Sequence, residues 1–519
     1  MQHKTPAPAP APAPDVSLPD TSGRRWRDPS PADAVRLDPA TVFAGGERNH
    51  HISNTAYPIA HDVSWGPYRV KRDDHAGVTA RAFADIDDLS LYVHIPFCET
   101  RCSFCEYTVV SGKDLDDTAA YKDALLKEIA AYGTLLDGAK KHVHGIDIGG
   151  GTPAFVPSQD IVDIVRALQQ TFDCGTGNGG GISIETTPKL AAAEPDKLKA
   201  YVDVGISRIS MGLQTIQPDL LKVLARDQNG IEHHHVAMQN MRRAGFERIN
   251  LDVMYGFADQ SDESLAATLH HTIGLGPEFI TLYRMRYKLT RISHQAPRAT
   301  ATLVKGHAAL ARSVLEAAGY VASPGKNTFV RQDIRDPATS LSPDRTGTSA
   351  YLTHRVIEGM PYLGLGLGAQ TFSHTTIAYN DGAVGKNLLP HRRAIEAGRL
   401  PIQDLYDLPR TQMMAKFVAV AFYFGEIDRQ AFQQKFDVAV DDAFPDEVAF
   451  VKAQGLMHET MGQCGTRPAL SLTPEGARHF AGVIALFFAP SVQGYLVDRD
   501  PETATDMDKA RRQALRIAS

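Results

Sequence analysis

Three cysteines stand within one short segment that follows an apolar run. The segment reads Cys98-Glu-Thr-Arg-Cys102-Ser-Phe-Cys105, a CxxxCxxC spacing. Three thiolates on one loop can each bind a different iron of a cubane cluster, which leaves the fourth iron open to a small molecule. Soft sulfur ligands also suit zinc, for which His94 is a candidate fourth ligand, so a zinc site is the alternative at this point.

The other histidines and cysteines do not suggest a second metal site. Cys174 and Cys464 have no partner at ligand spacing and are interpreted as packing residues. Residues 232–235, which include three consecutive histidines, are interpreted as a solvated helix start, because consecutive helical residues face different directions. Five cysteines in 519 residues provide no disulfide framework. A reducing cytoplasm is therefore the expected location.

Charge and hydropathy restrict the partners that we expect. The formal net charge is −6 at pH 7, which gives no support for nucleic acid or an acidic membrane surface as a partner. The chain has no apolar run long enough for a membrane span and no apolar leader typical of a secretory signal. A small molecule is the expected partner.

Glycines and carboxylates stand at the ends of further β-rich runs. Gly149-Gly150-Gly151 directly follows the run 142–148, and glycines allow the backbone to approach a ligand closely. Glu185 ends another such run, and Asp252 lies within an apolar one, where a charge is unusual unless it is functional. Taken alone, the glycines fit a tight turn equally well, and Glu185 fits a solvated strand end.

The elements that position these residues alternate along the chain. From residue 89 onward, short β-rich runs are separated by runs with helical periodicity. This order predicts a parallel sheet with right-handed crossovers, in which functional residues gather at the carboxyl ends of the strands. We therefore expect an α/β fold with a partial (β/α)6 barrel, whose strands are 89–95, 142–148, 181–186, 206–213, 248–256 and 278–286.

Composition suggests further divisions of the chain. Proline alternates with alanine near the N-terminus, which favours an extended, solvated arm. Near the other end, a strand at 469–472 leads into a helix with Thr473 as N-cap and Pro474 in its first turn. The expected division is a disordered arm at 1–40, the barrel at 41–300, a barrel extension with substrate-side elements and a buried strand (361–372) at 301–400, a mostly helical, winged-helix-like C-terminal domain at 401–490, and a tail at 491–519.

The segment YVHIPFCETRCSFC resembles the radical S-adenosylmethionine (SAM) superfamily and, within it, the HemN-like family of oxygen-independent coproporphyrinogen III oxidases. The resemblance extends over roughly residues 88–490, with the later motifs in the same order. It implies a [4Fe–4S] cluster on Cys98, Cys102 and Cys105 with SAM at the open iron. It also implies cleavage of SAM to methionine and a 5′-deoxyadenosyl radical.

The resemblance also assigns residues to SAM. Glu185 matches the partner of the SAM ammonium, and Arg226 matches the partner of its carboxylate. The other implied contacts of this first SAM are Tyr92, Gly150, Gly151, Thr152, Gln214 and Asp252. A second SAM is expected near the segments 282–288 and 365–372, with Arg286 and Gln370 as its candidate contacts and Arg284 as a further nearby cation.

One position departs from the decarboxylases of this family. Those enzymes carry a further cysteine two residues after the triplet, where this chain has Tyr107. The preferred interpretation is therefore a class C-type enzyme that uses two SAM molecules to methylate or cyclopropanate an sp² carbon of an aromatic small molecule, as in natural-product pathways. A porphyrinogen decarboxylase or another anaerobic haem-modifying enzyme is the alternative. A haem chaperone is disfavoured, because residues 374–380 do not match the HNxxYW-like signature of that branch.

The preferred interpretation also implies macromolecular partners. A radical SAM enzyme needs an electron donor such as flavodoxin or ferredoxin. A partner methyltransferase is a further candidate for a natural-product pathway.

Overall fold

The computed structural model describes residues 26–50, 52–59, 64–110, 117–175, 181–287, 290–334, 346–463 and 465–499. Residues 1–25 of the expected arm, Cys464, and residues 500–519 of the expected tail lie outside this part of the chain. None of the helices within the described ranges is both long and apolar enough to span a membrane.

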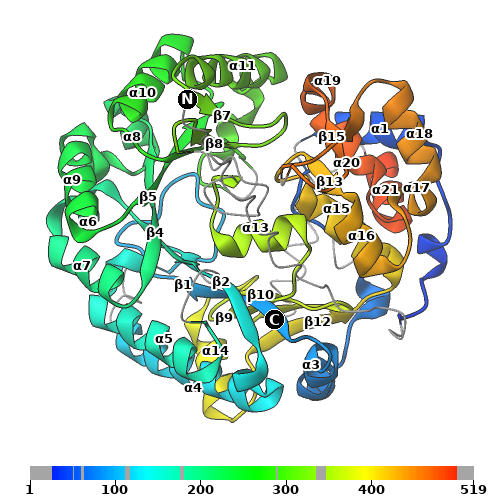
Figure 1. Cartoon of the computed structure of the whole chain (residues 1–519), viewed down its shortest axis with the longest axis horizontal. Coiled ribbons are helices and arrows are strands. Elements are labelled where there is room, and N and C mark those ends of the chain that lie inside the picture. Colours follow the sequence, from blue (N-terminus) through cyan, green and yellow to red (C-terminus); the bar gives the residue numbers. More distant parts are fainter. Residues whose placement is uncertain are drawn as a thin grey trace, which may run out of the picture.

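Six parallel strands form the centre of one large sheet (Figure 1). They are hydrogen-bonded in chain order, as predicted for a partial barrel. Their bounds are β1 (Asp88–Ile95), β2 (His142–Gly150), β3 (Gly181–Thr186), β4 (Ile206–Gln214), β5 (Arg248–Tyr255) and β6 (Phe279–Arg284). The apolar side chains of these strands form one core with the crossover helices. The predicted fold class is confirmed.

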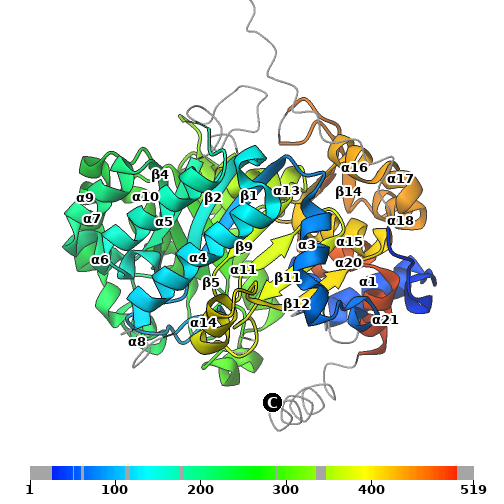
Figure 2. The ribbon, with the colours of Figure 1, turned by 90° about the horizontal axis from the view of Figure 1, so that it is seen from below.

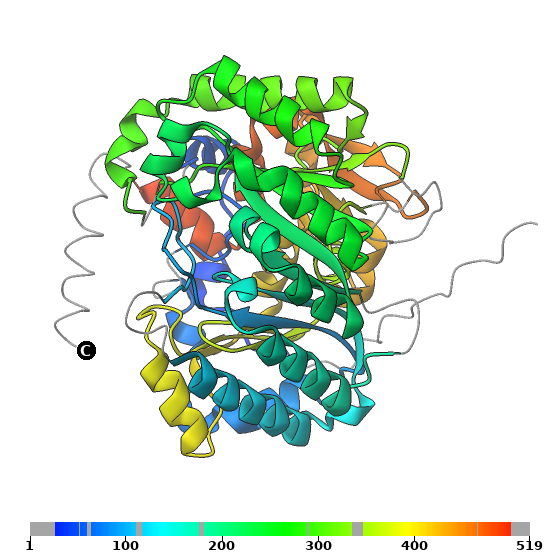
Figure 3. The ribbon, with the colours of Figure 1, turned by 90° about the vertical axis from the view of Figure 1, so that its left-hand side faces the viewer.

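Helices cover the convex side of this sheet (Figures 1 and 3). They connect successive strands, as right-handed crossovers require. They include α4 (Thr118–Leu136), α5 (Ser158–Thr171), α6 (Pro188–Ala193), α7 (Pro195–Asp203), α8 (Pro218–Val223), α9 (His234–Ala244), α10 (Asp262–Gly274) and α11 (Ala301–Ala317). The carboxyl ends of the strands are thereby left for the loops that carry the candidate site.

The sheet continues beyond both ends of the barrel. Strand β9 (Tyr362–Leu365) is parallel to β1, and β10 (Gln370–Phe372), β11 (Thr376–Asn380) and β12 (Ile402–Asp407) follow it in antiparallel order. At the other edge, β8 (Thr328–Arg331) pairs with β6, and β7 (Tyr320–Val321) with β8. The buried strand with tight turns expected at 361–372 is divided by a turn into β9 and β10. Gly366 and Gly368, with φ of +93° and +67°, reverse the chain between them.

One helix, α13 (Ala350–Ile357), lies against the concave side of the sheet (Figure 1). A Cβ at Gly145 of β2 would lie 2.2 Å from the backbone nitrogen of Tyr351, so the strand and the helix touch directly. Ser349 caps the helix and donates a hydrogen bond of 2.7 Å to Asp147 Oδ2. The helix therefore brings aromatic and basic side chains to the inner face of the barrel.

The C-terminal part has its own apolar core and a small antiparallel sheet. Strand β15 (Ala469–Leu472) lies between β13 (Glu426–Asp428) and β14 (Met457–Thr460). Thr473 accepts a hydrogen bond from the backbone of Gly476, as expected of its N-cap role. The helices are α15 (Arg410–Ala421), α16 (Arg429–Phe436), α17 (Val440–Ala443), α18 (Pro445–Ala453), α19 (Pro474–Arg478), α20 (Phe480–Leu486) and α21 (Pro490–Asp498). Helix α21 shows that the expected tail is folded up to residue 498.

The expectation of a disordered arm up to residue 40 is wrong for residues 26–40. Helix α1 (Pro39–Arg48) packs beside α20 and α21, far away in sequence (Figure 2). Asp33 is only 3% exposed. It accepts hydrogen bonds from Tyr68 Oη (2.6 Å) and Gln412 Nε2 (2.9 Å). Composition alone could not reveal these long-range contacts. Two other helices, α3 (His75–Phe83) and α14 (Leu388–Glu396), cover β12 and α4.

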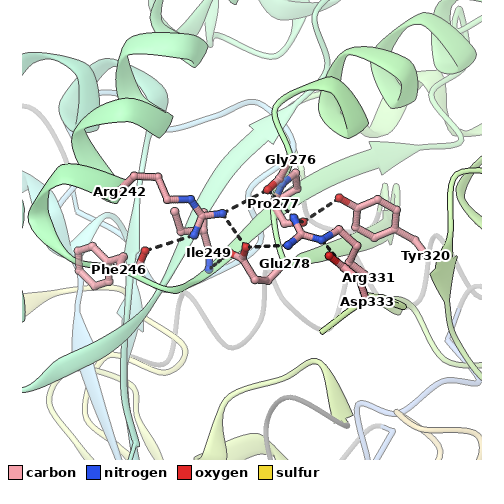
Figure 4. A network of polar contacts seen from close by, with 9 residues as sticks. All are labelled: Arg242, Phe246, Ile249, Gly276, Pro277, Glu278, Tyr320, Arg331 and Asp333. Atoms are coloured by element: carbon pink, nitrogen blue, oxygen red, sulfur yellow. Dashed lines mark hydrogen bonds and ion pairs between the residues drawn. The ribbon is translucent and has the colours of Figure 1, made fainter. Parts of the chain in front are cut away.

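A polar network fixes the ends of β5 and β6 that lie opposite to the candidate site (Figure 4). Glu278, which is 9% exposed in its side chain, pairs with Arg242 at 2.6 Å and with Arg331 at 3.5 Å. It also accepts a hydrogen bond from the backbone nitrogen of Ile249. Tyr320 donates to the carbonyl of Pro277 next to it. The network ties two central strands to the β7–β8 edge.

Candidate functional site

The three cysteines lie on a loop that follows β1 and closes on itself. The backbone nitrogen of Cys98 donates to the carbonyl of Val110 (3.2 Å), and the nitrogen of Val110 donates to the carbonyl of Pro96 (2.9 Å). We call residues 96–110 the cluster loop. Burial raises the pKa of the Cys98 thiol to about 12 and also raises the pKa of Cys105. These residues are therefore thiols at neutral pH unless a metal displaces their protons.

The cluster loop fits an iron–sulfur cube better than a single ion. Among the residues that the structure describes, no three histidine, cysteine or acidic side chains converge on one ion. A cube does not require such convergence, because each thiolate binds a different iron. His94, the candidate fourth zinc ligand, has both ring nitrogens engaged: Nε2 lies 2.7 Å from the carbonyl of Thr108, and Nδ1 lies 3.1 Å from Tyr92 Oη.

The glycine run brings the end of β2 against the cluster loop. Gly150 has a φ of +121°, and a Cβ there would lie 2.7 Å from the His94 ring. A Cβ at Gly151 would lie 2.6 Å from the carbonyl oxygen of Phe97. Thr152 Oγ1 is 3.5 Å from Cys98 Sγ. Close packing of the two loops therefore explains why glycine is needed at positions 150 and 151.

Tyr92 and Glu185 meet Gly149 on the inner face of the barrel. A Cβ at Gly149 would lie 3.0 Å from Glu185 Oε1 and 3.4 Å from the Tyr92 ring. The Glu185 side chain is accessible to water although protein surrounds it. The surrounding protein, together with the charges of Asp252 and Asp147, raises the pKa of Glu185 to about 8. Three carboxyl groups so close together favour a cationic ligand.

Asp252 is held by its neighbours on β4 and β5. Ser210 Oγ donates to one carboxyl oxygen (3.1 Å), and Asn250 Nδ2 donates to the other (2.7 Å). Burial raises the pKa of Asp252 to about 6, although Arg208 opposes the shift. Sequence reasoning missed Arg208, which donates to Ser183 at 3.2 Å. Arg208 is a charged residue within the apolar run 206–213, so the argument that singled out Asp252 could also have singled out Arg208.

Gln214 and Arg226 connect the end of β4 to the cluster loop. Gln214 adopts a φ of +69°, and its buried Oε1 has no hydrogen-bond partner. Arg226 donates from Nη1 to Cys102 Sγ (3.4 Å) and from Nη2 to the carbonyl of Gly212, while its buried Nε has no partner. Buried polar atoms without partners are unusual in folded proteins. The contact between Arg226 and Cys102 places a cation directly beside the cysteines.

Comparisons with known proteins agree with this geometry. The family model of the radical SAM superfamily matches residues 92–272. The oxygen-independent coproporphyrinogen III oxidase of Salmonella typhimurium is 31% identical over 241 residues, which cover 46% of this chain and 50% of that relative. The heme chaperone HemW of Buchnera aphidicola is 30% identical over 197 residues, or 38% of this chain and 50% of that protein. The chain thus matches about half the length of these relatives.

A solved structure extends the likeness beyond the matched domain. The coproporphyrinogen III oxidase HemN of Escherichia coli covers 84% of this chain and 96% of its own, with a TM-score of 0.67 at 23% identity. Residues 92–272 thus match the radical SAM superfamily, and the chain shares the fold of the HemN structure. The cofactors of radical SAM proteins are a [4Fe–4S] cluster and SAM, and the residues described above fit both groups.

The two residues expected at a second SAM lie in different surroundings. Arg286 follows β6 and forms an ion pair with Glu106 of the cluster loop. Gln370 lies on β10 and accepts a hydrogen bond from Tyr362 Oη of β9. Within the described ranges, no contact joins Arg286 to Gln370. The structure therefore brings Arg286, but not Gln370, into contact with the cluster loop.

Tyr107, which the sequence singled out, has a second tyrosine, Tyr283, among its electrostatic neighbours. The Tyr107 ring is 57% exposed and the Tyr283 ring 41% exposed. Surrounding protein nevertheless raises the pKa of both tyrosines, and their electrostatic neighbours include Glu185. Both tyrosines are therefore open to water beside the cluster loop. Tyr423, which follows α15, lies near Tyr107 as well.

Proposed function

We propose that this HemN-like radical SAM enzyme transfers a methylene or methyl unit to an sp² carbon of an aromatic small molecule. Cys98, Cys102 and Cys105 would hold the [4Fe–4S] cluster. When bound, the cluster and SAM supply a 5′-deoxyadenosyl radical, and a second SAM supplies the transferred carbon. An external electron donor such as flavodoxin or ferredoxin, and a partner methyltransferase, belong to the same proposal.

The residues around the cluster loop take separate roles in this proposal. Glu185 would accept hydrogen bonds from the SAM ammonium, and Arg226 would pair with the SAM carboxylate while it keeps Cys102 in place. Tyr92, the glycine run with Thr152, Gln214 and Asp252 would complete the pocket. The contact of Arg226 with Cys102 supports this assignment, because it places the guanidinium beside the cysteines.

The observation that carries the choice of reaction is Tyr107. Its exposed ring lies two residues after Cys105, where the family's decarboxylases carry a cysteine. With Tyr283 it offers aromatic surface to a planar substrate. The Arg286–Glu106 ion pair lies next to these rings. A second SAM would need to displace Glu106 before its carboxylate could pair with Arg286.

Porphyrinogen decarboxylation is the second candidate, because several relatives are named coproporphyrinogen III oxidases. Haem binding is favoured only by the relatives named HemW. The two enzymatic candidates differ in the molecule that loses hydrogen to the radical, which is SAM in the first and the porphyrinogen in the second.

The deciding experiment follows deuterium. The anaerobically reconstituted protein should hold about four irons per chain. With CD₃-labelled SAM and a strong reductant, methyl transfer predicts deuterium in 5′-deoxyadenosine and release of S-adenosylhomocysteine. Deuterium taken from labelled coproporphyrinogen III, without S-adenosylhomocysteine, would contradict the proposal in favour of decarboxylation. Cys105→Ala should abolish both iron binding and SAM cleavage, whereas the matched variant Cys174→Ala should retain them.

A further inference from the structure

A lysine far from the cysteines in sequence contacts the cluster loop. Lys386 lies between β11 and α14, and its Nζ donates to the carbonyls of Tyr107 (2.6 Å) and Glu106 (3.1 Å). These carbonyls belong to the two residues that directly follow Cys105. Lys386 has a backbone φ of +51°, which is unfavourable for residues other than glycine. Such a conformation persists only where surrounding contacts require it.

The segment that carries Lys386 is anchored on the buried part of the sheet. Asn380, at the end of β11, donates from Nδ2 to the fully buried carboxylate of Glu128 (2.9 Å). Thr108 Oγ1 of the cluster loop donates to the carbonyl of Gly382 at 3.5 Å. The lysine therefore extends from a fixed support to the cluster loop.

The positive charge of Lys386 interacts with acidic groups of the cluster loop. Burial and the nearby Arg101 lower the pKa of Lys386, whereas Cys105 and Glu106 favour its protonated form. The carboxylate of Glu106 pairs with Arg286. Arg101 donates to the carbonyl of Cys105 at 3.1 Å, so two cations approach the same cysteine.

We propose that Lys386 is a positioning residue that fixes the backbone after Cys105 and raises the reduction potential of the bound cluster. Reduction adds one negative charge to the cube and its thiolates, and a nearby ammonium stabilises that charge. The proposal rests on the cluster site proposed above. It is independent of which substrate is used, because it concerns the transfer of one electron to the cluster.

The test is an anaerobic redox titration of the reconstituted full chain, followed by electron paramagnetic resonance. Lys386→Met should reduce the equilibrium constant for cluster reduction about tenfold, which equals a downward shift of about 59 mV for one electron. Lys386→Arg should stay within about threefold of the wild type, because the charge is kept. Lys222→Met is the control, since this lysine is 73% exposed on nearby α8 and its charge is screened by water.

Each result decides a different point. A wild-type protein without iron would refute the cluster site itself. Lys386→Met with a full iron content and an unchanged potential would overturn the role of Lys386. If the methionine variant does not assemble a cluster, Lys386→Gln decides, because it keeps a hydrogen-bond donor without the charge. A wild-type potential in that variant would also overturn the proposal.

Discussion

The binding of SAM should depend on pH through Glu185. The pKa of this carboxyl is raised to about 8 by burial and by its acidic neighbours. At pH 7, only roughly one molecule in eleven would carry the ionised form. A SAM ammonium prefers the ionised form, so binding must first remove a proton. The affinity for SAM should therefore rise with pH until the pKa of Glu185 is passed.

The magnitude follows from this titration. Between pH 6 and pH 7 the dissociation constant of SAM should fall about eightfold, after allowance for the α-amino group of SAM, which itself titrates near 8. At pH 7, binding should release about 0.9 proton from Glu185. In Glu185→Gln, affinity should be weaker above pH 7, and this proton release should be lost.

Calorimetry on the anaerobically reconstituted protein can measure both quantities. Titrations at pH 7 in two buffers of different ionisation enthalpy give the number of protons released. Glu99→Gln is a matched control, because Glu99 lies on the cluster loop but pairs with Lys189 at its surface. A wild-type affinity that does not change between pH 6 and pH 7, with no proton released, would refute the reasoning on Glu185.

Three further variants test other parts of the structure. Arg226→Leu removes a charged donor beside the cysteines and should weaken SAM binding about tenfold or more in the same calorimetry. Asp33→Ala removes a buried acceptor shared by Tyr68 and Gln412 and should cost about 1–3 kcal/mol of stability, measured by urea unfolding. Glu128→Leu leaves buried His391 unpaired and should cost about 3–5 kcal/mol in the same assay. Unchanged unfolding midpoints would contradict these two stability estimates.

The central sheet could be predicted from the sequence because its signals are local. The strands at 142–148, 181–186 and 206–213 agree with β2, β3 and β4 to within two residues at each end. Each is a short apolar run bounded by turns, and each lies in a repeated strand–helix order. The cysteine loop and the carboxylates at strand ends were found in the same way, because parallel topology alone brings them together.

Other features depend on contacts that no local pattern contains. The segment 26–40 is folded because Asp33 accepts hydrogen bonds from Gln412 and from the backbone of Ser491, which lie on helices of the C-terminal part. His234 was expected to be solvated, but it is fully buried, with its Nδ1 2.9 Å from Nε2 of His271 on the next helix. Gln370 was assigned to the second SAM from its position in a motif. In the structure its side chain accepts a hydrogen bond from Tyr362 on the neighbouring strand.

The cluster loop is held by contacts that do not involve the side chain at position 107. Gly151 contacts the loop through the carbonyls of Pro96 and Phe97, and Lys386 contacts it through the carbonyls of Glu106 and Tyr107. These contacts are made to the backbone, so they do not depend on the side chain at position 107. A tyrosine can therefore stand there without disturbing the cysteines, and its side chain remains exposed. If the proposed function holds, a substitution at position 107 should change the substrate surface and leave the backbone contacts of the cysteine loop intact.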